Sequence, residues 1–575
     1  MDSINLKYKN TFFYWLLFAL TIETLVCLFL GFFSNETQIS NNNYTIVTAY
    51  IQNYNYLLAA ATLLVILVYL AIDTKKLFNN LFTQVRYKII TVCIFTVFAL
   101  LGIIKLISVI DTFNDTSYGS NSRVTVPVFV TMFITTLTFS IINICFRFKL
   151  RLLNANNIKK ELRNYIPIIL LVCFMCWTFI GCINSTIIKK AFNGSYSLKD
   201  GYWAFLMYGV ILITGILLGI GNDSDKKRLN LISSLTICVT LLTAFSFLIN
   251  KRSELTFGFD SFFQWINSKT NASYYLFFNK ALFRNVNHYC YLLSIVVVSS
   301  VGLMVAKKEL WKKYLYYFCY LILASILIKS DTFGAYLGVA FSIIFMLLHA
   351  FIIKKNILPL TIVFISFILL SVLIRNADGK MYLEYNFKTT YNDLIKVKNY
   401  ITSTNTKNVN NPPVIISNNN DSTALKLTKA KYEGIWNTGA GRMQIWFAAI
   451  ELIKQKPIFG FGLESLHNEF YGQFGISEGR THNLILQLSA TTGIPGMLLY
   501  IIAISIVLIR NLKNYKNWND IEYITMFVCI SYMISSMFGN SSYYVSPYFM
   551  LFVGFIIIKP NKLKNNIENP QQNVS

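Results

Sequence analysis

The chain has 575 residues, of which 55% are hydrophobic and only 13% are charged, and its mean hydropathy is +0.50. Since soluble domains carry about 25% charged residues, this composition largely excludes a soluble enzyme, a disordered protein and a secreted disulfide scaffold. The net charge of +25 comes from basic residues scattered over short loops between apolar stretches. That pattern is typical of membrane proteins and argues against nucleic-acid binding. The sequence therefore predicts an all-α integral membrane protein.

Apolar runs long enough to cross a bilayer recur along the whole chain. A membrane-spanning helix needs about 20 apolar residues, so the pattern predicts about twelve to fourteen spans. The candidate spans lie near 11–33, 55–72, 88–110, 124–146, 164–183, 203–221, 229–249, 288–306, 314–328, 334–353, 357–374, 484–508, 523–538 and 542–559. The first run has full spanning length and no A-x-A cleavage site, so a span is expected there rather than a signal peptide.

The distribution of Lys and Arg predicts the orientation of these spans. Loop 34–54 has no basic residue and loop 111–123 has only Arg123, whereas the alternate loops are short and basic. The basic loops lie near 73–87, 147–163, 222–228, 307–313, 354–356 and 509–522. Because basic loops stay on the cytoplasmic side, both termini are expected in the cytoplasm.

This orientation divides the chain into five parts. They are N-terminal spans (1–250), further spans with an outer loop at 251–287 (251–374), one large extracytoplasmic loop (375–483), C-terminal spans (484–560) and a cytoplasmic tail (561–575). Within the large loop, residues 403–424 are Asn-rich and are expected to be a mobile surface excursion. Residues 440–483 are expected to be ordered and to carry the function.

Helical spacing within 440–483 predicts one amphipathic helix, which Pro457 ends. Its predicted apolar face consists of Met443, Trp446, Phe447, Ile450 and Ile453. Such a helix can lie on the outer membrane surface. Gly460 and Gly462 then predict a tight turn.

Polar chemistry gathers at the predicted outer face. Of the four histidines, His349 lies at the cytoplasmic end of a span, whereas His288, His467 and His482 lie at the outer face. Three arginines share that face: Arg284, Arg442 and Arg480. A single arginine there can simply snorkel to the interface, but several beside histidines favour a site for phosphate, which suits the planar guanidinium.

Three ordered motifs carry a resemblance to a known family. They are Gly441-Arg442-x3-Trp446, Pro457-x2-Gly460-x-Gly462 and His482-Asn483-x9-Gly493-x2-Gly496. This set resembles the C-terminal signature of the O-antigen ligase and polymerase superfamily. Two further segments resemble the same family more weakly: FRNVNHYCYLL at 283–293 and the segment from Ser330 to Ala335. Residues 1–250 resemble the family only in forming a series of membrane spans.

The resemblance implies an activity and its partners. Members have a GT-C-like, all-helical membrane fold and move glycan from a polyprenyl-diphosphate-linked oligosaccharide to a glycan or lipid acceptor. They work at the outer face of the bacterial cytoplasmic (inner) membrane, without a cofactor or a metal. Other polysaccharide-export proteins are further expected partners, and nucleic acid is not.

The resemblance also implies roles for individual residues. Arg284, Arg442, Arg480 and Asn483 are expected to bind the diphosphate, with Arg442 also stabilising the leaving charge. His482, or else Glu464 or His467, is expected to be the catalytic base; His482 could instead hydrogen-bond a phosphate oxygen. Asn483 could simply cap a helix, and the motif glycines could simply permit tight turns and close helix approach.

Several functions remain open on the sequence alone. The first is polymerisation of surface-polysaccharide (O-antigen or capsule) repeat units, and the second is ligation of finished glycan to lipid A core, wall polymer or protein. A lipid-linked oligosaccharide flippase is the third, although no internal repeat is visible and the long loop favours an enzyme. A non-catalytic membrane anchor is the fourth. Asp223-Ser-Asp225 has the spacing of a D-x-D metal motif, but its basic neighbours favour an ordinary charged loop.

Overall fold

The computed structural model describes part of the chain, and none of the described residues lies in a strand. The described residues are 144, 162–194, 200–219, 224–250, 286–330, 332–374, 382–406, 435–436, 438–439, 441–539 and 545–558. The first four predicted spans lie outside them, apart from residue 144. Arg284, nearly all of the Asn-rich segment and the C-terminal tail also lie outside the described residues.

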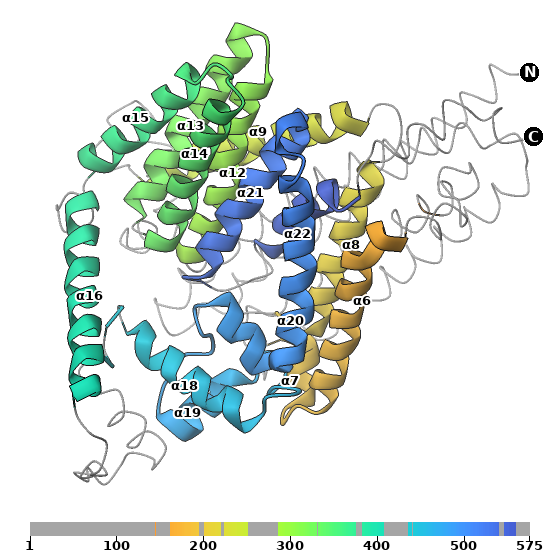
Figure 1. Ribbon diagram of the computed structural model, residues 1–575, viewed down its shortest axis with the longest axis vertical. Helices are drawn as coiled ribbons and strands as arrows, with labels where there is room; N and C mark the ends of the chain where they lie inside the picture. Colours follow the sequence, from red (N-terminus) through yellow and green to blue (C-terminus); the bar gives the residue numbers. More distant parts are fainter. Residues whose placement is uncertain are drawn as a thin grey trace, which may run out of the picture.

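A helix lies at each predicted span within the described residues (Figure 1). These helices are α6 (Leu162–Ile183), α8 (Tyr202–Leu218), α9 (Ser224–Asn250), α12 (Val286–Ala306), α13 (Leu310–Lys329), α14 (Phe333–Ile352), α15 (Leu358–Leu373), α20 (Leu484–Leu512), α21 (Asp520–Ser536) and α22 (Ser546–Ile556). Four described stretches are long and apolar enough to cross a membrane: Tyr165–Ile183, Asn287–Ala306, Phe333–Ile352 and Leu484–Leu512. The fold is that of an all-helical membrane protein.

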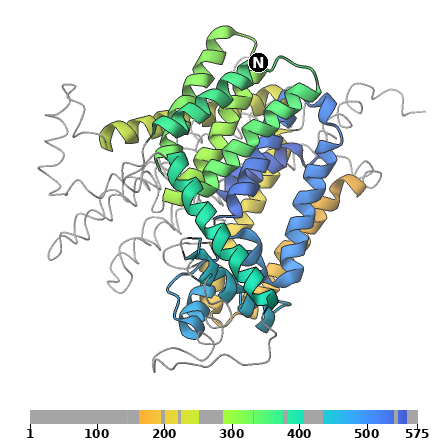
Figure 2. The same cartoon turned by 60° about the vertical axis from the view of Figure 1, so that its left-hand side comes forward.

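Several helices pack against partners that are distant in sequence. α12 contacts α21 as well as the following helices α13 and α14, while α8 packs along α22 and α20 along α6, as Figures 1 and 2 both show. Small residues allow the closest approach: a Cβ at Gly215 of α8 would lie 2.5 Å from the carbonyl oxygen of Leu551 in α22. Close backbone contact of this kind is typical of helices that associate in a membrane.

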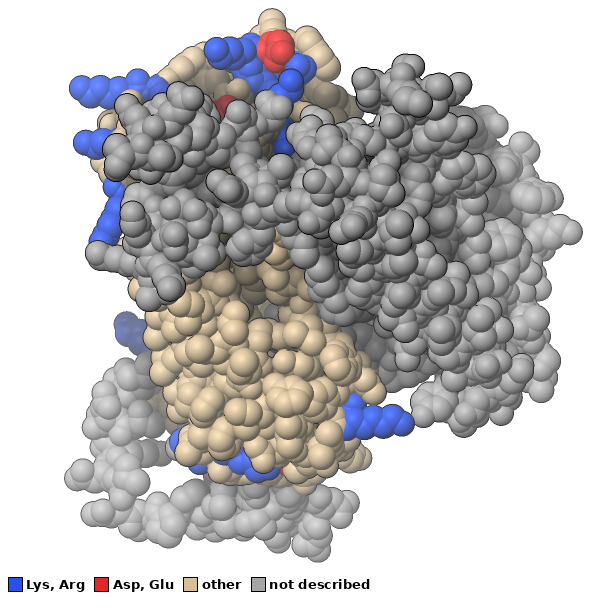
Figure 3. Space-filling model, turned by 90° about the vertical axis from the view of Figure 1, so that its right-hand side faces the viewer, with Lys and Arg blue, Asp and Glu red and all other residues tan. Residues whose placement is uncertain are grey.

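Charged side chains gather at the two ends of the bundle. Figure 3 shows Lys and Arg clustered at the upper end and a smaller group at the lower end. The upper end carries the turns that follow α12, α14 and α20; we call it the basic end. We call the opposite end, where α18 (Arg442–Gln455) and α19 (Leu466–Phe474) lie, the motif end. That the motif end faces the outside of the cell stays a prediction.

The large loop contains more regular structure than the sequence predicts. α16 (Tyr382–Thr406) and α19 were not expected, and α7 (Ile188–Asn193) is a further short helix between α6 and α8. In Figure 2, α16 descends from α15 toward the motif helices. Its Val397 and Tyr400 pack against Trp436 and Phe447, which attaches α16 to α18.

The helix predicted within 440–483 is confirmed as α18, but its apolar face matches the predicted one only in part. α18 buries Ile445, Ala448, Ala449 and Leu452 beside Phe447, because α19 and α20 cover that side. The other four residues of the predicted face, Met443, Trp446, Ile450 and Ile453, are only half-buried. α18 is therefore a packed helix of the motif end. The sequence pattern missed part of this face because alanines occupy the contact of α18 with its neighbouring helices.

Candidate functional site

Two of the sequence motifs meet where α20 is broken. Gly493 has φ 76° and ψ 169°, so α20 consists of two helical halves and not the continuous helix predicted for 484–508. The break frees carbonyl oxygens: Phe461 N–H donates to Ala490 at 2.9 Å and Gly462 N–H to Thr491 at 2.9 Å. Within a membrane such groups must find partners inside the protein. Here the Pro457–Gly462 motif supplies them.

The glycines of these two motifs allow their backbones to touch. A Cβ at Gly493 would lie 1.9 Å from the carbonyl oxygen of Ile458, and one at Gly460 would lie 2.5 Å from the carbonyl carbon of Thr491. Both glycines also have positive φ, which side chains disfavour. The reading of these glycines as residues for tight turns and close approach is confirmed.

The segment that carries His482 is fixed on both sides. The indole N–H of Trp446 donates to the carbonyl oxygen of Thr481 at 2.9 Å, and the N–H of Thr481 donates to Gln487 Oε1 at 2.9 Å. His482 itself has φ 54°, one of three positive-φ residues other than glycine in the described chain; Glu464 is another. Residues held in such sparsely populated conformations cluster at functional sites. The surrounding bonds thus hold His482 in a conformation that it would not adopt freely.

Asn483 caps the first half of α20. Its Oδ1 accepts the N–H of Leu486 at 3.1 Å, and its Nδ2 donates to the carbonyl oxygen of Met537 at 3.2 Å. Of the two roles left open by the sequence, the structure shows capping. The Met537 contact also ties His482 to the end of α21.

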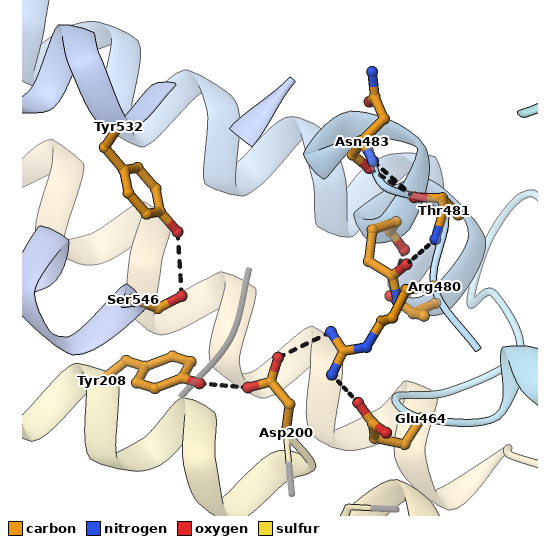
Figure 4. A network of polar contacts seen from close by, with 10 residues as sticks. Asp200, Tyr208, Glu464, Arg480, Thr481, Asn483, Tyr532 and Ser546 are labelled. Carbon is orange, nitrogen blue, oxygen red and sulfur yellow. Dashed lines mark hydrogen bonds and ion pairs between the residues drawn. The ribbon is translucent and has the colours of Figure 1, made fainter. Parts of the chain in front are cut away.

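A buried ion cluster lies beside this segment (Figure 4). Arg480 pairs with Asp200 at 3.0 Å and with Glu464, and the Tyr208 hydroxyl donates to Asp200. Arg480 and Glu464 are each 5% exposed, and Asp200 is 2% exposed. Burial raises the pKa of Asp200 to about 6, although the charge of Arg480 opposes the shift. Arg480 and Glu464 thus bind each other inside the protein.

Sequence reasoning missed Asp200 and Tyr208. The available signal was a single carboxylate immediately before an apolar span, in SLKDGYWAF. An ionisable residue at such a position is a functional candidate. Its partners lie far away in the chain, however, so no local pattern connects it to Arg480.

Arg442 begins α18 and is half-buried. The preceding turn is held by α16, because the N–H of Gly439 donates to Asp393 Oδ2 at 2.9 Å. The Arg442 guanidinium lies close enough to the Tyr291 hydroxyl to act on it electrostatically, but no hydrogen bond or ion pair joins it to another described residue. Tyr291 in turn donates to the carbonyl oxygen of Phe538 at 3.0 Å.

The turn after α21 therefore connects the surroundings of both main candidates. Met537 accepts from Asn483, beside His482, and Phe538 accepts from Tyr291, on which the charge of Arg442 acts. The two segments that resemble the family more weakly, 283–293 and 330–335, contact each other, since the Thr332 hydroxyl donates to Asn287 Oδ1 at 3.2 Å.

The remaining histidines occupy different environments. His467 is exposed on α19 and stacks on Tyr471, with ring centroids 6.4 Å apart. His482 Nε2 lies 3.9 Å from Glu478, and this interaction lowers the pKa of Glu478. His288 is buried at the start of α12. At the basic end, His349 Nε2 lies 2.9 Å from the carbonyl oxygen of Tyr515.

Asp225, the described aspartate of the D-x-D segment, lies in the first turn of α9. Asp225 pairs with Arg228 at 2.5 Å, and Arg228 is buried and donates to the carbonyl oxygen of Phe555 at 2.6 Å. Across the described ranges, no group of three or more His, Cys, Asp and Glu side chains could hold a metal ion.

These features define an all-helical membrane protein with a preorganised polar site at one end of its bundle. Residues 318–501 match the family model described as O-antigen ligase. The match runs from α13 through the break in α20, and it confirms the resemblance to the O-antigen ligase and polymerase superfamily. It supports an activity of the ligase or polymerase type in a membrane-embedded enzyme. No curated protein matches the chain.

Proposed function

We propose that this protein transfers a glycan from a polyprenyl-diphosphate carrier to an acceptor hydroxyl at the outer face of the bacterial cytoplasmic membrane, as a polymerase of surface-polysaccharide repeat units. The observation that carries the proposal is the hydrogen bond from Trp446 to Thr481. It joins the helix that begins at Arg442 to the segment of His482, so a cation and an imidazole belong to one hydrogen-bonded unit.

Arg442 is assigned to the diphosphate. In the reaction the acceptor oxygen forms a bond to the anomeric carbon while the bond from that carbon to the diphosphate breaks. The leaving lipid diphosphate is already acidic, so it needs charge neutralisation more than a proton. The Arg442 guanidinium suits this role because it is half-buried and no described carboxylate pairs with it. Arg284, outside the described residues, is the second candidate for the same role.

His482 is assigned to the acceptor. The attacking hydroxyl must lose its proton, and the imidazole is the side chain whose ordinary pKa lies nearest neutrality. The strained backbone and the bonds at Thr481 and Asn483 support a preorganised role. A phosphate ligand is the alternative role for His482. Glu464 and Arg480 are left out of both roles because they bind each other, and exposed His467 is a weaker candidate for the base.

Two alanine variants test the site. We expect Arg442→Ala and His482→Ala to abolish glycan transfer while the protein still accumulates in the membrane. His349→Ala is the matched control, because it removes an imidazole at the basic end, and it should retain transfer. Surface polysaccharide of normal length in both site variants would overturn the assignment.

Deletion of the gene in its host separates the proposed reaction from the alternatives. Single repeat units on the lipid carrier, without a ladder of longer chains, are expected for a polymerase. Long chains that stay on the carrier and never reach the final acceptor would instead indicate a ligase. Precursors trapped at the cytoplasmic side would indicate a flippase and contradict the proposal.

A further inference from the structure

The ion cluster of Asp200, Glu464 and Arg480 joins three distant parts of the chain. Asp200 precedes α8, Glu464 lies between α18 and α19, and Arg480 lies two residues before His482. Figure 4 shows the Arg480 guanidinium lying between the two carboxylates, each bound by a different nitrogen. The cluster is thus a three-way connection that ends next to the proposed base.

Stability alone is a poor explanation for this cluster. Burying ions costs several kcal/mol per ion, and apolar replacements are often neutral or stabilising. Here two carboxylates share one cation, so with both ionised the cluster keeps an unbalanced negative charge in a site that is almost fully buried. A planar guanidinium does, however, fix the relative positions of its partners, because its donor nitrogens hold both carboxylates in one plane.

Other contacts converge on the Glu464 turn. The hydroxyls of Ser185 and Ser465 lie 2.8 Å apart, and Lys190 Nζ donates to Asn468 Oδ1 at 3.2 Å. The turn that carries Glu464 is therefore held against the α6–α7 region. Through Arg480, the same support reaches the segment of His482. These supporting helices lie outside residues 318–501, the range that matches the O-antigen ligase family.

We propose that Arg480 is a positioning residue for His482, with Asp200 and Glu464 as its two anchors. The proposal rests on the proposed function. In it, Arg480 contacts neither the diphosphate nor the acceptor. It sets where the imidazole lies, and a displacement of about 1 Å at a reacting group can lower a rate about 100-fold.

The first test replaces the guanidinium group of Arg480 while keeping its positive charge. Arg480→Lys retains a cation but loses the planar pair of donors. Arg228→Lys is the matched control, because Arg228 is also buried and also pairs with an aspartate, but lies against the end of α22. Full-length protein in lipid vesicles is assayed with lipid-linked glycan extracted from the deletion strain, at varied glycan concentration. We expect Arg480→Lys to lower kcat at least tenfold with KM unchanged, whereas Arg228→Lys keeps kcat within twofold at a similar loss of Tm.

The second test uses Asp200→Asn, which keeps the shape and removes the charge. This variant leaves Arg480 with one carboxylate in a neutral pair. We expect Tm to stay the same or rise while kcat falls at least fivefold with KM unchanged. A residue with a merely structural role could not lower the rate of a protein that is equally stable.

The outcomes separate this proposal from the proposed function. An Arg480→Lys variant as active as Arg228→Lys would overturn the positioning role alone. A raised KM with unchanged kcat would also overturn it, because Arg480 would then be contacting the lipid-linked glycan. Wild-type protein that transfers no glycan, or a fully active His482→Ala variant, would overturn the proposed function itself.

Discussion

Trp446 and Thr481 are 35 positions apart in the chain, and the indole N–H of one donates to the carbonyl oxygen of the other at 2.9 Å. Trp446 belongs to the motif of Arg442, and Thr481 adjoins the motif of His482. A family signature that reads as separate short motifs is therefore one bonded unit in space.

Removing this hydrogen bond should weaken the protein and its activity together. Trp446→Phe keeps an aromatic ring but leaves a carbonyl oxygen without its donor, which costs about 1–3 kcal/mol when the group is buried. We expect a lower Tm and a reduced rate of glycan transfer. Trp518→Phe is the control, because its indole donates to the carbonyl oxygen of Asn511 at 2.8 Å at the basic end. That variant should lose comparable stability but retain more activity. Equal activity in the two variants would argue against a role of the Trp446–Thr481 hydrogen bond in glycan transfer.

The break in α20 should not tolerate a side chain. Gly493→Ala would place a Cβ 1.9 Å from the carbonyl oxygen of Ile458 and strain a positive φ. We therefore expect little of this variant to accumulate in the membrane, as measured by immunoblot. Gly209→Ala is the control: a Cβ there meets nothing within 4 Å. Normal accumulation and activity of Gly493→Ala would contradict the described backbone contact.

The buried Asp200 predicts a pH dependence of stability. Its pKa in the folded protein is about 6, above the value of about 3.9 in an unfolded chain. The folded state then binds the extra proton, so this contribution to stability is full below about pH 4 and is lost as the pH rises through 6. Arg480, Glu464 and Tyr208 are the charged or titratable groups that contact or act on it most directly.

Thermal unfolding in detergent tests the direction in which stability changes with pH. The Tm of Asp200→Asn minus that of wild type should increase between pH 5 and pH 7.5, because only the wild type ionises there. A difference that stays constant or decreases over this range would show that burial does not raise the pKa of Asp200 in the folded protein.

The predicted orientation can be tested with one cysteine. Ile415→Cys lies in the Asn-rich segment of the predicted outer loop. It should react with a membrane-impermeant thiol reagent in intact cells whose outer membrane, if present, has been permeabilised. Labelling is measured against wild type, whose native cysteines all fall in apolar runs. Labelling that requires cell lysis would reverse the orientation and exclude a reaction at the outer face.

The membrane helices could be predicted because their signal is local. Runs such as 334–353 and 484–508 carry length and hydropathy within one stretch, and helices lie there as α14 and α20. The motif glycines also predicted a close approach between backbone segments. The break at Gly493 was missed because one glycine and one proline in an apolar run do not reveal which backbone will satisfy the freed carbonyls.

The site was only partly predictable, because half of it comes from long-range pairing. Arg480 was expected to bind phosphate, since an arginine at the predicted outer face gives no sign of a partner 280 positions away. Asp200 was overlooked for the same reason. The apolar face of α18 was misread because its contact residues include Ala448 and Ala449, whose small side chains contribute little to a hydrophobic pattern.

The broken α20 has a mechanical consequence. A membrane helix that is longer or shorter than the bilayer is thick responds by tilting, and a rigid helix would swing its far end as it tilts. In this protein α20 is divided at Gly493, and its first half, 484–492, is bound to the Pro457–Gly462 segment and to Met537, while Ile494 at the start of the second half donates to the carbonyl oxygen of Pro457. We therefore expect the orientation of His482 to depend less on the thickness of the surrounding lipid than it would at the end of one rigid helix.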